Sequence, residues 1–117
     1  MEILCKMREI YRAIADVEEQ IEKTYGISLN EGMLLCCLRK NTSMCASDIA
    51  QPLGLTMSNT SKVIKSVEDK EFVIRDLNKD DKRKMFFTLT DKGRKKVESI
   101  SIDNIDIPKE LSTVFNK

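Results

Sequence analysis

Apolar residues recur in steps of three and four over the first 21 positions, and no glycine or proline occurs before Gly26. This heptad pattern predicts a single helix over residues 1–24. The apolar seam consists of Ile3, Met7, Ile10, Ile14, Val17 and Ile21. A helix with such a seam needs a partner, which is either the rest of its own domain or a second subunit.

Two shorter helices are predicted between Ser28 and Leu53. Ser28 and Glu31 have the spacing of a capping box, which indicates a helix that continues to about Lys40. Its predicted buried face comprises Met33, Leu34, Cys37 and Leu38. After a turn at 41–43, a helix is predicted over 45–53, with its inward side formed by Ile49, Ala50 and Leu53.

A fourth helix is predicted over 57–70, after the glycine turn at 54–56, and Thr56 is suited to cap it. The positions spaced for burial are Val63, Ile64 and Val67. This leaves hydrogen-bonding and cationic side chains on the faces that meet solvent or a partner. They are Ser58, Asn59, Ser61, Lys62 and Lys65.

Two strand-like runs, 72–77 and 85–89, are separated by the strongly charged segment 78–84, which predicts a β-hairpin with a charged tip. Thr90 can cap a further helix from Asp91 to about Ile102. Pro108 suits the first turn of a last short helix that ends near Phe115. The predicted fold is therefore mainly α with a small β-hairpin wing, in one domain over 1–117.

The net charge of +1 conceals a separation of charge along the chain. Residues 56–96 contain twelve Lys and Arg against seven Asp and Glu, a balance of +5, whereas 1–55 and 97–117 carry −2 each. Positive charge gathered on one module is what contact with phosphate requires. The alternative is a charged hairpin that meets only solvent.

Several classes of protein find no support in the composition. No apolar run is long enough to span a membrane and no signal peptide is evident, so a cytoplasmic location is expected. Cys5, Cys36, Cys37 and Cys45 lack C-x-x-C spacing, which indicates neither a disulfide framework nor a metal site. Histidine is absent, which rules out Ser-His-Asp and Cys-His catalysis. We expect no enzyme activity and no cofactor.

Three segments together resemble the winged helix-turn-helix of the MarR (multiple antibiotic resistance regulator) family, over roughly residues 25–97. They are Leu53-Gly-Leu-Thr56, the helix 57–70, and Asp81-Lys-Arg83 followed by Leu89-Thr90-Asp-Lys-Gly93. Glu71 stands where that family usually has the glycine that closes the recognition helix in a left-handed conformation. Cys45 replaces the usual capping threonine of the preceding helix, and Pro52 falls in that helix's last turn.

The resemblance implies a winged helix-turn-helix over 28–97, with recognition helix 57–70 and wing 72–89. Dimerisation segments would flank it at 1–24 and 98–117, the latter shorter than in the family. The resemblance also implies that the protein binds a pseudo-palindromic operator on double-stranded DNA as a homodimer, and that the seam of the first helix holds the two subunits together. It further implies a repressor that is relieved by a small-molecule effector. The implied DNA-binding residues are Thr56, Ser58, Asn59, Ser61, Lys62, Lys65, Asp81, Lys82, Arg83 and Lys84.

Two alternatives remain open at the level of sequence. The chain could be a winged-helix protein-interaction module that does not read DNA. It could also be a redox-sensing regulator that uses Cys5, because peroxide-sensing members of the family carry a reactive cysteine near this place in the first helix.

Overall fold

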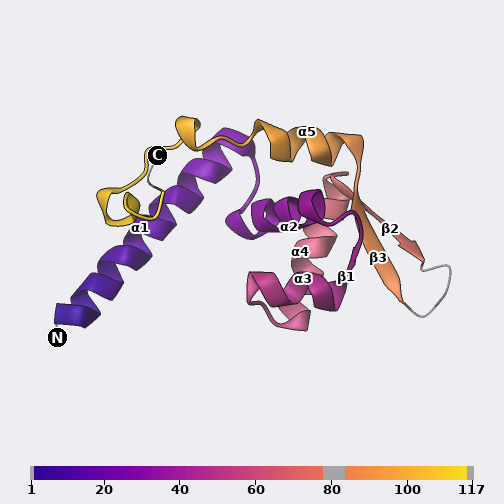
Figure 1. The fold of residues 1–117 in the computed structure, drawn as a ribbon, viewed down its shortest axis with the longest axis horizontal. Coiled ribbons are helices and arrows are strands. Elements are labelled where there is room, and N and C mark those ends of the chain that lie inside the picture. Colours follow the sequence, from indigo (N-terminus) through magenta and orange to yellow (C-terminus); the bar gives the residue numbers. More distant parts are fainter. Residues whose placement is uncertain (1, 78–83, 116–117) are drawn as a thin grey trace. The chain divides into compact units, whose positions relative to one another are not determined.

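The computed structural model describes residues 2–77 and 84–115. In chain order the helices and strands are α1 (Glu2–Tyr25), α2 (Leu29–Lys40), β1 (Met44–Cys45), α3 (Ala46–Leu53), α4 (Met57–Asp69), β2 (Val73–Leu77), β3 (Met85–Leu89) and α5 (Asp91–Ser99) (Figure 1). Two short 3₁₀ helices follow, η1 (Ile102–Asn104) and η2 (Lys109–Leu111). The predicted fold class, mainly helical with a small sheet, is confirmed.

The chain divides into two compact units. One contains residues 1–29 and 100–117, and therefore α1 with the C-terminal segment. The other contains residues 30–99, and therefore all the elements of the winged helix-turn-helix. We call them the α1 unit and the winged unit.

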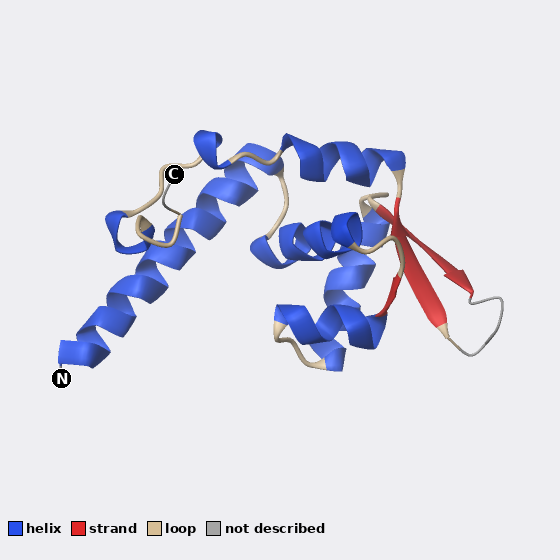
Figure 2. Ribbon diagram, in the orientation of Figure 1, coloured by secondary structure: helices blue, strands red, loops and turns tan. Residues whose placement is uncertain are grey.

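The sheet of the winged unit has three antiparallel strands in the order β1-β3-β2 (Figure 2). The hairpin pairs Val73 with Leu89 and Arg75 with Phe87, and β1 adds the pair Met44 and Phe87 on the other side of β3. Strand β1 was not predicted, and the expected helix 45–53 begins one residue later. A strand of two residues is too short to show an alternating pattern.

Helix α2 buries a different face from the one predicted. Leu34 and Leu38 are buried as expected, but Leu35 is also buried and Met33 is 42% exposed. Glu31 is buried as well, so the buried face runs through residues 31, 34, 35 and 38. It is shifted by about one residue from the predicted face. Cys37, predicted to lie on the buried face, is only half-buried, as is its neighbour Cys36.

The core of the winged unit combines the inner faces of α2, α3, α4, α5 and the sheet. Its buried side chains include Leu34, Leu35, Leu38, Ile49, Ile64, Val67, Phe72, Val73, Phe87 and Val97. Leu53 and Val63, predicted to point inward, are half-buried. In the part of the chain that the structure describes, no helix combines the length and apolar character needed to cross a membrane.

The two halves of α1 differ in burial. Ala13, Val17, Ile21 and Tyr25 are buried, so the second half of the predicted seam lies in the interior. Ile14 is half-buried. The apolar side chains of the first half are exposed: Ile3, Leu4, Met7, Ile10 and Tyr11.

The C-terminal segment is tied to α1 by hydrogen bonds. The Tyr25 hydroxyl accepts from the Ser101 backbone N–H at 2.9 Å and from the Asn104 amide at 3.1 Å. The Gln20 side chain donates to the Asp106 carbonyl at 2.7 Å and accepts from the Asp106 N–H at 2.7 Å. Two predicted boundaries in this part of the chain are wrong, and the bond of the Ser101 N–H to Tyr25 accounts for the first. Helix α5 ends at Ser99 instead of about residue 102, and the helix expected over 108–115 is the single 3₁₀ turn η2.

Candidate nucleic-acid interface

The first turn of α4 is held by two threonines. Thr56 has extended backbone angles, and its hydroxyl oxygen accepts the Asn59 backbone N–H at 3.1 Å, which makes it the N-cap. Thr60 is fully buried, and its hydroxyl donates to the Thr56 carbonyl at 2.7 Å. The burial of Thr60 was not predicted, because its hydroxyl gave the position a polar character. The two bonds fix the point where α4 begins.

The polar residues predicted to contact DNA lie on the exposed side of α4. Thr60, Ile64 and Val67 form its buried side. Ser58, Asn59, Ser61, Lys62 and Lys65 are exposed, as is Thr56 in front of them. This grouping is the one that the helical spacing indicated. Contact of these residues with DNA stays a prediction.

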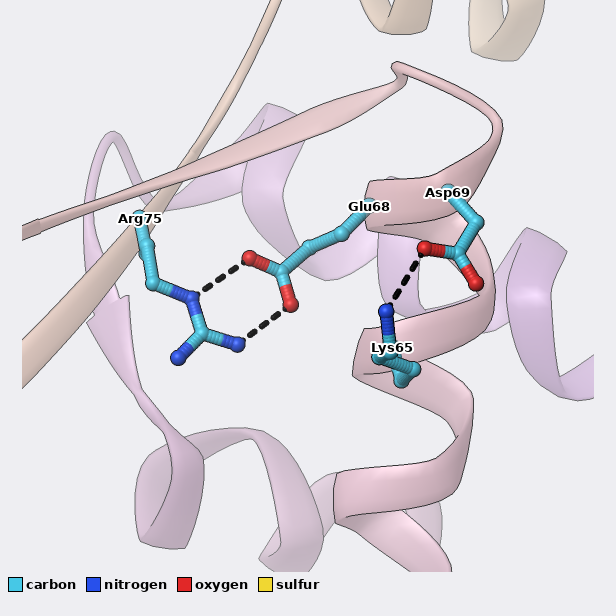
Figure 3. A network of polar contacts seen from close by, with 4 residues as sticks. All are labelled: Lys65, Glu68, Asp69 and Arg75. Atoms are coloured by element: carbon cyan, nitrogen blue, oxygen red, sulfur yellow. Dashed lines mark hydrogen bonds and ion pairs between the residues drawn. The ribbon is translucent and has the colours of Figure 1, made fainter.

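The last two turns of α4 carry acidic residues that pair with cations (Figure 3). Lys65 Nζ lies 2.9 Å from Asp69 Oδ1, and this exposed hydrogen bond raises the pKa of Lys65. The Arg75 guanidinium of β2 donates from Nε and Nη2 to the two carboxylate oxygens of Glu68, at 2.6 and 2.5 Å. These bonds raise the pKa of Arg75. A bidentate pair of this kind fixes both groups in orientation as well as in distance.

A buried carboxylate joins α2 to the same end of α4. Glu31 is only 4% exposed, and its two oxygens accept from Lys70 Nζ at 2.8 and 2.9 Å. The Ser66 hydroxyl donates to the same carboxylate. The spacing of Ser28 and Glu31 predicted a local capping role and did not reveal these partners. One signal was present, since Ser66 and Lys70 are four residues apart and therefore share a face of α4.

The chain leaves α4 through a left-handed residue. Glu71 has φ +66°, and among the described residues it is the only non-glycine residue with positive φ. Its N–H bonds to the Glu68 carbonyl at 2.9 Å, and the Phe72 N–H bonds to the Val67 carbonyl at 3.0 Å. This is the Schellman arrangement that usually ends on glycine. Glutamate thus adopts the conformation expected of the glycine that it replaces.

The Leu-Thr-x-x-Gly segment has a structural role at this joint. The Thr90 N–H donates to the Phe72 carbonyl at 3.0 Å, and its hydroxyl donates to the Glu71 carbonyl at 2.7 Å. The same hydroxyl oxygen accepts the Gly93 N–H at 2.9 Å and so caps α5. A Cβ atom on Gly93 would lie 2.0 Å from the Phe72 carbonyl oxygen, which explains why glycine is needed there. The motif therefore connects the exit of α4 to the start of α5.

The other two departures from the family pattern are accommodated locally. Cys45 is the N-cap of α3 without a side-chain cap bond, and its thiol donates to the Asp48 carboxylate at 3.1 Å. Pro52 lies within α3, which ends at Gly54 in a left-handed conformation with φ +67°.

The basic wing tip is described only in part. Lys84 is exposed immediately before β3, whereas the predicted contacts Asp81, Lys82 and Arg83 lie outside the described residues. A groove of about 390 Å³ separates α4 from the wing, and both Ser61 and Lys84 line it. Its other walls include Met57, Ile64, Arg75 and Phe87. Of the predicted DNA-binding residues, Ser61 of α4 and Lys84 thus border one groove of the winged unit.

The cysteines differ in exposure. Cys5 is exposed in the first half of α1, whereas Cys36, Cys37 and Cys45 are half-buried. Burial, together with the neighbouring Cys36, raises the pKa of the Cys37 thiol. No disulfide joins any of the four. Within residues 2–77 and 84–115, no group of three Cys, Asp or Glu side chains is placed to hold a metal ion.

Comparison with known proteins identifies the family. Residues 27–85, half of the chain, match the model of the MarR family. An uncharacterized HTH-type transcriptional regulator of Bacillus subtilis (strain 168), YwaE, is 27% identical over 80% of this chain and 54% of its own length. A second, YfiV, is 28% identical over 70% of this chain and 50% of its own length. The chain thus spans about half the length of the curated relatives that it matches.

Solved structures show the same fold. The overoxidized form of AbfR, bound to DNA, has a TM-score of 0.77 and 25% identity, over 97% of this chain and 85% of AbfR. A mutant of MarR from E. coli, complexed with operator DNA, has a TM-score of 0.76 and 19% identity, over 88% of this chain and 79% of MarR. With the family model matching half of its residues, this chain belongs to the MarR family of helix-turn-helix transcriptional regulators.

Proposed function

We propose that this protein is a transcriptional repressor that binds a pseudo-palindromic DNA site as a homodimer. Helix α4 enters the major groove, and the wing lies beside the adjacent minor groove. The observation that carries the proposal is the exposed polar side of α4. Asn59 and Lys62 offer an amide and a cation in its first two turns, where side chains of a recognition helix reach base edges and phosphates. The solved AbfR and MarR complexes with DNA support it.

The homodimer is proposed from the exposed half of α1. Ile3, Met7 and Ile10 are 69%, 48% and 42% exposed, and they lie on one heptad seam. Leu4 and Tyr11 extend this apolar surface. A second copy that packs against the seam removes it from water. Sedimentation velocity of Met7→Asp with Ile10→Asp tests this, because two carboxylates in the contact should leave a monomer where the wild type is a dimer.

Release by a small-molecule effector is the regulatory part of the proposal. The groove between α4 and the wing has the volume of a small-ligand pocket, and Ser61 and Lys84 lie in its wall. An occupant there would compete with DNA for these two residues. A compound that binds the protein should therefore weaken its affinity for DNA.

The decisive experiment measures Asn59→Ala by filter binding, on a duplex selected from random sequences and on a scrambled duplex. The substitution should cost about 1 to 3 kcal/mol on the selected duplex and little on the scrambled one. Asn30→Ala is the matched control, because Asn30 is an exposed asparagine near the start of another helix. With roughly eight to ten phosphate contacts per dimer, wild-type binding should weaken steeply with salt.

Two results would count against the proposal. Equal losses on both duplexes would mean that Asn59 does not read sequence. A wild type with no affinity for any duplex at moderate salt would instead favour a winged-helix module that binds another protein.

A further inference from the structure

An arginine occupies an inward position of the wing. In β2, Val73 is 2% exposed and Ile74 is 55% exposed, so the inward face contains Val73 and, two residues later, Arg75. The sheet register agrees, because Arg75 is paired directly with the buried Phe87 of β3. The Arg75 guanidinium lies 5.6 Å from the centre of the Phe87 ring. The charged group of Arg75 therefore lies on the same face of the sheet as the Phe87 ring, although the arginine side chain is partly exposed.

The structure supplies a partner for that charge. Two N–H groups of Arg75 are directed at the two oxygens of Glu68, at 2.6 and 2.5 Å (Figure 3). The Glu68 side chain is only 17% exposed, whereas that of Arg75 is 51% exposed. The less exposed carboxylate therefore depends on this cation. The arginine is oriented toward α4 by two hydrogen bonds.

The pair also bridges two parts of the candidate interface. Glu68 belongs to α4, which carries the predicted base contacts, and Arg75 belongs to the wing, whose tip carries the predicted phosphate contacts. The backbone joins these parts through residues 70–72, where Glu71 occupies a left-handed conformation. The pair of Glu68 and Arg75, which are seven positions apart in sequence, is a second connection between α4 and the wing. A bidentate connection restricts rotation of the wing about this joint.

From this geometry we propose that Glu68 and Arg75 are positioning residues for DNA binding. They hold the wing at the angle to α4 at which both reach the duplex, and neither contacts DNA. The inference rests on the proposed function. It differs from the obvious alternative, in which Arg75 is another phosphate contact.

Two single variants and their double variant separate the two ideas, each measured by filter binding on the selected duplex. Glu68→Gln and Arg75→Lys each remove the bidentate pair, and Arg75→Lys keeps the positive charge. If the pair positions the wing, each should weaken binding roughly three- to tenfold, and the double variant should be no weaker than either single one. The matched control is Asp69→Asn, which removes a carboxylate from the adjacent residue that pairs within α4.

The expected pattern is a loss for Glu68→Gln and for Arg75→Lys but none for Asp69→Asn, together with recovery in the exchanged pair, Glu68→Arg with Arg75→Glu. The proposal is overturned if Glu68→Gln binds as well as Asp69→Asn or better. That result would mean that Arg75, once released, binds phosphate itself.

A measurement without DNA keeps this inference separate from the proposed function. Amide hydrogen exchange of Val73–Leu77 in the free protein should be roughly threefold faster in Glu68→Gln and Arg75→Lys than in the wild type or Asp69→Asn. Unchanged exchange would show that the pair does not hold the wing. If the variants show faster exchange than the wild type but the wild type binds no duplex, only the proposed DNA-binding function is refuted.

Discussion

The two ends of α4 are built from different kinds of residue. At the first end, Thr56 caps the helix, and the side chains that follow on the outer face are small, polar and exposed. At the last end, Ser66, Glu68 and Lys70 bond to α2 and to the wing, and Glu71 turns the chain. The difference suggests that the two ends of α4 have different roles. We expect the exposed side chains of the first end to tolerate substitution without loss of fold, and the contacts of the last end to set the orientation of α4.

This comparison predicts that substitutions at the last end cost more stability than those at the first. Gly93→Ala should have the largest effect, because its Cβ would lie 2.0 Å from the Phe72 carbonyl oxygen, immediately after α4. We expect a loss of about 3 kcal/mol or more in the free energy of unfolding, measured in urea by circular dichroism. The control is Lys95→Ala, at an exposed position of α5, the helix that contains Gly93. Its free energy of unfolding should change little.

Glu31→Ala should be next. It removes the acceptor of the Ser66 hydroxyl and the Lys70 ammonium at a site where the carboxylate is almost fully buried. The expected loss is about 2 to 3 kcal/mol, against less than about 0.5 kcal/mol for the exposed Glu98→Ala. If both variants unfold at the same urea concentration, the buried carboxylate does not anchor α4.

Thr56→Ala tests the first end. It removes the oxygen that accepts the Asn59 N–H and should cost about 1 kcal/mol of stability. Thr56→Ser keeps that oxygen and should remain close to the wild type. A loss as large as that of Glu31→Ala would contradict the proposed difference between the two ends.

Glu71→Gly is the smallest effect and has the opposite sign. Glycine adopts positive φ without the clash that a Cβ atom causes, so the variant should be more stable by about 0.5 kcal/mol. Glu71→Ala keeps the Cβ atom and should show no gain. A glycine variant no more stable than the alanine variant would mean that this turn is not strained.

Much of the fold followed from local pattern. Helices α1 and α4 and the two strands of the hairpin have clear periods and lie close to where they were predicted. Only the second half of the α1 seam is buried, and Thr60 takes the place of Val63 on the buried side of α4. The exposure of Ser58, Asn59 and Lys62 follows from the same periodicity. For these residues, position within a helix was sufficient information.

The missed features depend on residues that are distant in sequence. Glu31 bonds to residues 35 and 39 positions away, and no local spacing reports that. The end of α5 depends on Tyr25, which binds Ser101 from 76 positions away. Arg75 was not singled out in the sequence, and only the sheet register shows that it shares a face with the buried Phe87. Tertiary contacts decided these cases, and composition and periodicity do not encode them.

The bonding of Tyr25 has a practical consequence for spectroscopy. The chain has no tryptophan and two tyrosines, Tyr11 and Tyr25, and both lie in α1. Tyr25 is buried with its hydroxyl bonded to Ser101, whereas Tyr11 is 69% exposed beside the apolar seam. Intrinsic fluorescence of this protein therefore reports on the α1 unit alone. Events at α4 become visible to it only if they change the surroundings of these two phenols.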